Sequence, residues 1–143
     1  MENLKNLYPI TAVFAVVMVK EGFVLVHDKD KPAPILYKNP GGMIEPGETP
    51  FQALERELTK EECRGLPVGS AKELFVADNH KRGYSVMFYF ISEPEFSVAE
   101  IEAGGEVDIL KAVSRKELET MLAYGDIVPQ HAAAIGTALR KFL

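Results

Sequence analysis

The sequence has one cysteine, a deficit of positive charge and no long hydrophobic run. Cys63 alone excludes an intrachain disulfide and any multi-cysteine zinc site, and it fits a reducing cytoplasm, where we expect the protein. With 16 Lys and Arg against 21 Asp and Glu, the net charge is −5. Nucleic acid is therefore not an expected partner, because binding to a phosphate backbone usually leaves a basic footprint.

Membrane segments and linkers are also missing from the sequence. The longest apolar run, 10–19, is half of the roughly 20 residues that a membrane-spanning helix needs. It leads into Lys20-Glu21 rather than a small-residue cleavage site, so we expect neither a signal peptide nor a membrane partner. No repeat and no stretch rich in Gly, Ser or Pro divides the 143 residues, which predicts one domain over 1–143.

The hydrophobic pattern predicts a sheet covered by helices. Apolar and β-branched runs predict strands over 12–19, 23–27, 35–38, 74–78, 84–92 and 108–113. Helical spacing and capping residues predict helices over 49–62, 114–123 and 130–143, with a long connection over 93–106. Several strands are apolar on both faces, so helices must cover both sides of the sheet. We predict an α/β (α+β) fold, an α/β/α sandwich with a mixed central sheet.

The segment 41–65, GGMIEPGETPFQALERELTKEECRG, holds glycine, glutamate and arginine at fixed spacing. Five residues separate Gly42 from Glu48, and seven more separate Glu48 from Arg56-Glu57-Leu58. This segment resembles the box of the Nudix hydrolase family, G-x5-E-x7-R-E-U-x-E-E-x-G-U, in which U is an aliphatic residue. A match with fixed spacing over many positions is far more specific than a glycine-rich loop alone.

The resemblance implies a hydrolase that depends on Mg²⁺ (or Mn²⁺). Its substrate would be a small-molecule nucleotide, namely a nucleoside diphosphate linked to another group. Water would attack the diphosphate and release a nucleoside monophosphate with either pyrophosphate or a phosphorylated product. One carboxylate, or a water on the metal, would serve as the base. Hard Mg²⁺ takes carboxylate oxygens, which suits a site built from glutamates.

Particular residues take roles from the resemblance. Glu57 and Glu61 would bind the metal, and a further acidic ligand would come from a later loop, where Glu106 ranks ahead of Glu102 and Asp108. Glu48 and Arg56 would support catalysis as a bidentate pair. Gly41 and Gly42 would form a turn that lets the backbone approach the substrate closely. Lys38 and Lys60 would contact its phosphates.

Lys60 departs from the family pattern, because the first of the paired glutamates belongs at its position. On a regular α-helix, Lys60 and Glu61 lie within about 60° of Glu57, whereas Glu62 lies about 140° away. Only a one-residue register slip such as a π-bulge would place Glu62 on the same face of the helix as Glu57. Otherwise Glu62 is expected to be an ordinary surface residue. Cys63 and Arg64 also depart from the pattern, and Cys63 is expected to be a small buried side chain.

Two outcomes for Lys60 stay open. Its side chain either turns away along its aliphatic stem and leaves Glu57 and Glu61 with one metal, or its ammonium replaces a second metal and contacts phosphate. Either outcome predicts fewer metals than the full family pattern. The substitution also keeps open an alternative function, a non-catalytic Nudix-fold module that binds a nucleotide as a sensor or scaffold. The apolar helix 130–143 could pack on its own sheet or on a second copy in a homodimer.

Overall fold

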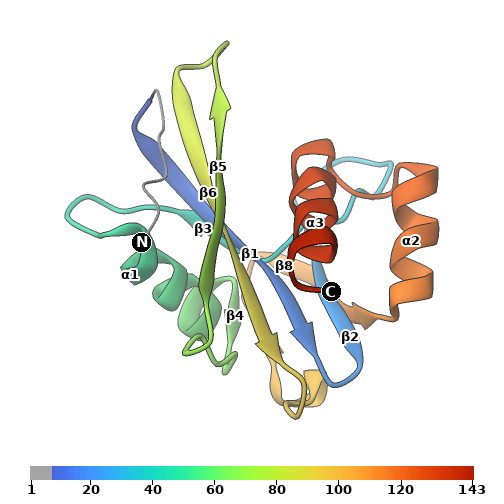
Figure 1. Ribbon diagram of the computed structural model, residues 1–143. Helices are drawn as coiled ribbons and strands as arrows, with labels where there is room; N and C mark the ends of the chain where they lie inside the picture. The colour runs from blue at the N-terminus through green and yellow to red at the C-terminus, as the bar shows by residue number, and fades with distance from the viewer. Residues whose placement is uncertain (1–7) are drawn as a thin grey trace.

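The computed structural model describes residues 8–143, in which a mixed β-sheet lies between helices on its two faces (Figure 1). The strands follow the order β5-β6-β1-β2-β8, and β3 pairs with β1. Their bounds are β1 Ile10–Val19, β2 Gly22–Asp28, β3 Gly41–Met43, β5 Lys72–Asn79, β6 Tyr84–Glu93 and β8 Val107–Val113. The predicted α/β/α sandwich with a mixed sheet is confirmed. The first seven residues of the predicted domain 1–143 lie outside the described part.

Strand β1 forms the centre of the sheet and positions the glycine turn. It pairs with β6 in parallel along its length and with β2 in the antiparallel sense at Met18–Val19. Its first half pairs instead with β3, where Ala12–Phe14 lie opposite Gly41–Met43. A Cβ atom on Gly41 would overlap the backbone of β1, so only glycine allows this close approach. The turn is therefore held against the central strand of the sheet.

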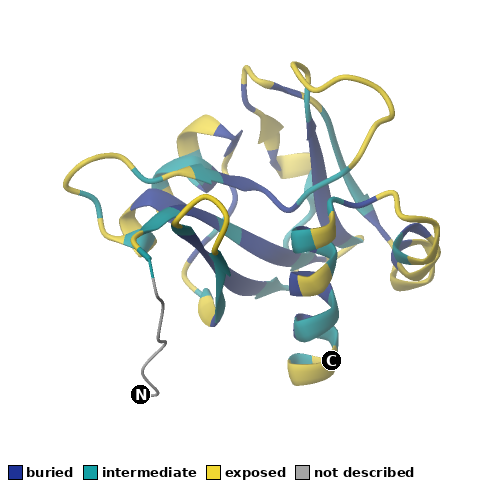
Figure 2. Ribbon diagram, turned by 90° about the horizontal axis from the view of Figure 1, so that it is seen from above, coloured by how far each residue is buried: buried dark blue, intermediate teal, exposed yellow. Residues whose placement is uncertain are grey.

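Helix α1, Pro50–Arg56, covers one face of the sheet, and α2, Arg115–Tyr124, and α3, Pro129–Phe142, cover the other (Figure 1). Alternate residues of β1 supply both cores, with Val16 on the α2/α3 side and Val17 on the α1 side. The central strands β1, β2 and β6 are accordingly mostly buried, whereas many of the loops are exposed (Figure 2).

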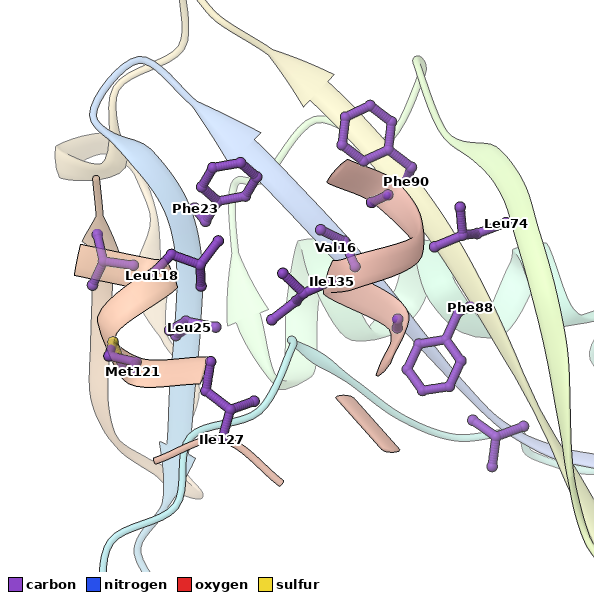
Figure 3. Close-up of a cluster of buried hydrophobic side chains, with 14 of the residues drawn as sticks. Val16, Phe23, Leu25, Leu74, Phe88, Phe90, Leu118, Met121, Ile127 and Ile135 are labelled. Atoms are coloured by element: carbon purple, nitrogen blue, oxygen red, sulfur yellow. The ribbon is translucent and has the colours of Figure 1, made fainter. Parts of the chain in front are cut away.

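On the α2/α3 side, Phe23, Leu118 and Ile135 belong to one buried cluster that joins the sheet to both helices (Figure 3). On the α1 side, Leu54 and Leu58 are fully buried. The burial of each such side chain contributes about 1.5–3 kcal/mol. This packing fixes the segment that carries the acidic residues.

Several predicted boundaries differ from the structure. The predicted strand 35–38 is reduced to two isolated bridges, at Tyr37 and Lys38. The connection 93–106 contains a 3-10 helix, η2 Val98–Glu100, and a short strand, β7 Glu102–Ala103, which pairs with β4, Cys63–Arg64. The predicted helix 49–62 is α-helical only as far as Arg56.

The C-terminal helix α3 packs on its own sheet, where it contacts β5 and β1 and buries Ala134, Ile135 and Ala138. The homodimer stays a prediction. Within residues 8–143, the helices are too short or too polar for any of them to cross a membrane.

Candidate active site

Helix α1 begins at a capping box that fixes where the acidic segment starts. The Thr49 hydroxyl oxygen accepts a hydrogen bond from the Gln52 backbone N–H at 3.1 Å, and the Gln52 amide oxygen accepts one from the Thr49 N–H at 2.9 Å. Pro50 occupies the first helical position, where its missing N–H has no cost. The buried residues Ala53 and Leu54 then seat the helix on the sheet.

The helix continues as a π-helical turn, η1 Glu57–Glu61. The Glu62 backbone N–H donates to the Glu57 carbonyl oxygen at 2.8 Å, five residues earlier. Such a turn holds one more residue than an α-helical turn, so Glu62 stacks over Glu57 as a residue four positions later would in an α-helix. The expectation of a regular helix is therefore wrong, and so is the expectation that Glu62 is a surface residue, since it is buried.

The π-turn forms one wall of a cavity of about 630 Å³. The residues lining the cavity are Phe14, Asp28, Lys31, Lys38, Gly41, Gly42, Met43, Glu45, Arg56, Glu57, Glu61, Glu62 and Glu106. It thus brings together most of the predicted site residues, from the glycine turn, the helix and the later loop. Of the three acidic candidates after the box, only Glu106 lines it; Glu102 pairs with Arg64 instead, and Asp108 pairs with His27.

Two predicted site residues do not line the cavity. Lys60 is exposed and has no ion pair within the described residues, so its position does not support a contact with substrate. The reason is the extra residue of the π-turn, which turns Lys60 toward solvent and Glu62 toward the cavity. Glu48 lies behind Arg56, which donates to its carboxylate from Nε at 2.8 Å and from Nη2 at 2.9 Å. The expected bidentate pair is present.

Arg56 connects the carboxylates of the cavity wall. Its Nη1 group lies 2.9 Å from a Glu61 oxygen and 3.3 Å from a Glu57 oxygen, and its Nη2 group donates to the Met43 carbonyl oxygen at 2.9 Å. The hydrogen bonds from Arg56 lower the pKa of Glu48 to about 2, and those carboxylates raise the pKa of Arg56 in return. The guanidinium therefore fixes three glutamates and the glycine turn in one arrangement.

Glu57 lies against the glycine turn. A Cβ atom on Gly42 would overlap the Glu57 carboxylate, so any larger residue here would displace that carboxylate from its place. Burial raises the pKa of Glu57 to about 7; Arg56 opposes the shift, and the charges of Glu62 and Glu61 add to it. A cation would stabilise the charged form of a half-buried carboxylate that has two like charges nearby.

Glu62 is bound from two sides. The Lys38 ammonium donates to its Oε2 atom at 2.7 Å, and the Gly41 backbone supplies a further hydrogen bond. Burial raises the pKa of Glu62, whereas Lys38 and Gly41 act against that rise. Asp28 lies on the other side of the same ammonium, with its Oδ2 atom 3.2 Å away.

The glycine turn has a further support that the sequence did not indicate. The Asn39 backbone N–H donates to Nδ1 of His131 on α3 at 3.1 Å, and both residues are buried. Burial lowers the pKa of His131 to about 3, so its ring is neutral and Nδ1 can accept this bond. Helix α3 thereby holds the segment that carries Gly41 and Gly42.

The donor set fits a hard divalent cation in its chemistry. Glu57, Glu61 and Glu62 offer only carboxylate oxygens, which are the donors that Mg²⁺ and Mn²⁺ prefer. Within residues 8–143, no three His, Cys, Asp or Glu side chains are gathered closely enough to hold a metal. Arg56 and Lys38 give the physical reason, because each occupies carboxylate oxygens that a metal would use.

The raised pKa of Glu57 predicts a stability effect that depends on pH. The folded protein keeps a proton on Glu57 between pH 4.5 and about 7, where the unfolded chain has lost it. Stability therefore falls as pH rises through this window. In chelator, the Glu57→Gln variant should be more stable than wild type at pH 8 by about 2 kcal/mol, and the difference should nearly vanish at pH 4.5. Urea unfolding of both proteins at both pH values measures this difference in stability. A difference that does not change with pH would contradict the raised pKa of Glu57.

The comparisons with known proteins identify the family. A family model for the NUDIX domain matches residues 9–134, so the chain belongs to the Nudix family. No curated protein sequence matches this chain.

Solved structures share the fold. A bifunctional NMN adenylyltransferase/ADP ribose pyrophosphatase from Francisella tularensis, in complex with AMP and a Mn ion, superposes with a TM-score of 0.75 at 24% identity. That match covers 96% of this chain but 43% of the other, so this chain spans less than half of that protein. The NUDIX domain of Shewanella oneidensis NrtR, in complex with ADP ribose, gives a TM-score of 0.75 at 18% identity, with 94% and 89% covered. These likenesses show the fold.

Proposed function

We propose that the protein is a metal-dependent Nudix hydrolase, which cleaves the diphosphate of a nucleoside diphosphate linked to another group. The observation that carries the proposal is the π-turn. The family box places its paired glutamates three and four residues after the glutamate that follows arginine, whereas Glu61 and Glu62 come four and five after Glu57. Because the π-turn holds one extra residue, Glu61 and Glu62 together supply the pair, and Lys60 is the extra residue.

The proposed ligands of Mg²⁺ or Mn²⁺ are Glu57, Glu61 and Glu62, with Glu106 completing the set from the later loop. This set adds Glu62 to the ligands expected from a regular helix. The ion would neutralise the diphosphate and activate the attacking water. Arg56 would orient the glutamates for this task.

The remaining residues of the cavity would bind the substrate. The ammonium groups of Lys31 and Lys38 can attract its phosphates, and Gly41 and Gly42 let the backbone approach them closely. Water adds to one phosphorus, the bridging P–O bond breaks, and each product leaves with a phosphate group. Products are a nucleoside monophosphate and either pyrophosphate or a phosphorylated compound.

A second cavity supports a substrate with a group beyond the phosphates. It holds about 340 Å³ and is mainly apolar, with Pro32, Pro34, Leu36 and Val128 in its lining. Asp28, Lys31 and Lys38 line both cavities, so the two adjoin. A cavity of this size suits a base or a sugar-linked group. The neighbours with AMP and ADP ribose make adenosine diphosphate derivatives the first compounds to test.

The alternative is a non-catalytic module that binds a nucleotide as a sensor. It is favoured by the ion pairs of Arg56 and Lys38, which already neutralise the carboxylates without a metal. A cytoplasmic location remains part of the proposal, in keeping with Cys63 as a buried free thiol whose pKa burial raises to about 12.

Hydrolysis of a substrate panel separates the two functions. The purified protein is incubated with ADP ribose, other nucleoside diphosphate sugars and nucleoside triphosphates, each with Mg²⁺, Mn²⁺ or EDTA. The hydrolase predicts phosphate-ester products that depend on metal and are lost in EDTA and in Glu57→Gln. Saturable binding of a nucleotide with no turnover across the panel would establish the module instead.

A further inference from the structure

We propose that Lys38 is the internal counter-ion of the carboxylate site and competes with a divalent cation for Glu62. The inference rests on the proposed metal site and concerns a residue outside the box. Lys38 lies directly before the glycine turn, where an isolated bridge to Val26 fixes its backbone.

The ammonium group of Lys38 lies between two carboxylates. It is 2.7 Å from Oε2 of Glu62 and 3.2 Å from Oδ2 of Asp28, and it lies 5.1 Å from the centre of the Phe14 ring. The Glu62 side chain is only 7% exposed and that of Lys38 17%. A carboxylate that stays charged when buried needs a cation, either from a side chain or from a metal, and here Lys38 supplies it.

A divalent cation and this ammonium compete for the same carboxylate. The Lys38 hydrogen bond and the bond from the Gly41 backbone both engage Glu62. An ion that binds Oε2 of Glu62 replaces the contact with Lys38, and an ion that binds Oε1 lies close to the same ammonium. In both cases the two positive charges repel each other.

Asp28 offers the displaced ammonium a second partner. Its Oδ2 atom is already within ion-pair distance of Lys38, and its Oδ1 atom is buried without a hydrogen bond inside the described part of the chain. A shift of Lys38 from Glu62 toward Asp28 would satisfy this acceptor. Asp28 and Lys38 both border the two cavities, so the ammonium would stay where an anionic substrate passes.

Binding of Mn²⁺ to the full-length protein without nucleotide tests the exchange. Free Mn²⁺ is measured by electron paramagnetic resonance during titration of wild type, Lys38→Met and Lys38→Gln. We expect both variants to bind Mn²⁺ about tenfold more tightly than wild type, since the competing charge is gone. Lys38→Gln keeps a donor for Glu62 and serves if Lys38→Met fails to fold. Both variants should also unfold at a lower temperature in chelator, because Glu62 loses its counter-ion.

The control is Lys31→Met, which removes the same charge from the same cavity. Lys31 has no side-chain ion pair within residues 8–143, so its loss should leave Mn²⁺ affinity within about twofold of wild type. Equal tightening in Lys31→Met would overturn the proposal in favour of a general charge effect. Unchanged or weaker binding in both Lys38 variants, with wild type binding Mn²⁺, would overturn the counter-ion alone. If neither wild type nor any variant binds Mn²⁺, both the proposed metal site and the proposed role of Lys38 are wrong.

Discussion

The Glu62→Gln variant is expected to lose hydrolytic activity by about a hundredfold or more, equivalent to about 3 kcal/mol of transition-state stabilisation. The π-turn directs this carboxylate into the cavity beside Glu57, and glutamine removes the charge that a divalent cation needs while it keeps the shape. Measurement of kcat in saturating Mg²⁺, on a substrate found in the panel, tests this expectation.

The matched control for Glu62→Gln is Glu55→Gln. Glu55 is exposed on α1 and does not line the cavity, so its variant should keep wild-type activity. If Glu62→Gln stays fully active while Glu57→Gln is inactive, Glu62 is not a ligand, and the register assigned to the π-turn is wrong.

The Arg56→Ala variant is expected to lose about 3 kcal/mol of folding stability, because it removes several charged hydrogen bonds and leaves the partly buried Glu48 and Glu57 without their cation. Glu48, Glu57 and Glu61 all contact this guanidinium, which is itself only 18% exposed. For a chain of this length the loss corresponds to a fall in melting temperature of about 10 °C. Thermal unfolding in EDTA measures the change without any contribution from metal.

Arg56→Lys separates charge from geometry at this position. Lysine keeps the positive charge but cannot make the bidentate contact with Glu48 or reach the Met43 carbonyl at the same time. It should recover less than half of the lost stability. An Arg56→Ala variant with the same melting temperature as wild type would show that Arg56 does not stabilise the carboxylates.

The arrangement of layers could be predicted because the core follows simple periodicity. The run 12–19 is apolar on both faces, and β1 indeed contributes to both cores. The helix beginning after Thr49 was predictable from its capping box. The apolar residues of segment 35–38 predicted a strand that does not form. Ile35 and Leu36 are exposed, and only isolated bridges form beside them.

The site was predictable where it follows the box and not where it depends on tertiary contacts. Arg56 and Glu57 come from fixed spacing, and their contacts follow from it. Glu62 was missed because the helix was taken as regular, although the spacing of Glu61-Glu62, one residue late, was a signal of an insertion. Asp28 meets Lys38 only because β2 ends beside the glycine turn, a proximity that no local pattern indicates.

Deletion of Lys60 tests the central claim, that the π-turn absorbs one extra residue and so presents Glu61 and Glu62 together with Glu57. Without Lys60 the turn can close as a regular α-helix with both glutamates in the same place. We expect the shortened protein to hydrolyse its substrate within about threefold of wild type, a change below 1 kcal/mol. A folded deletion variant as inactive as Glu62→Gln would contradict the claim.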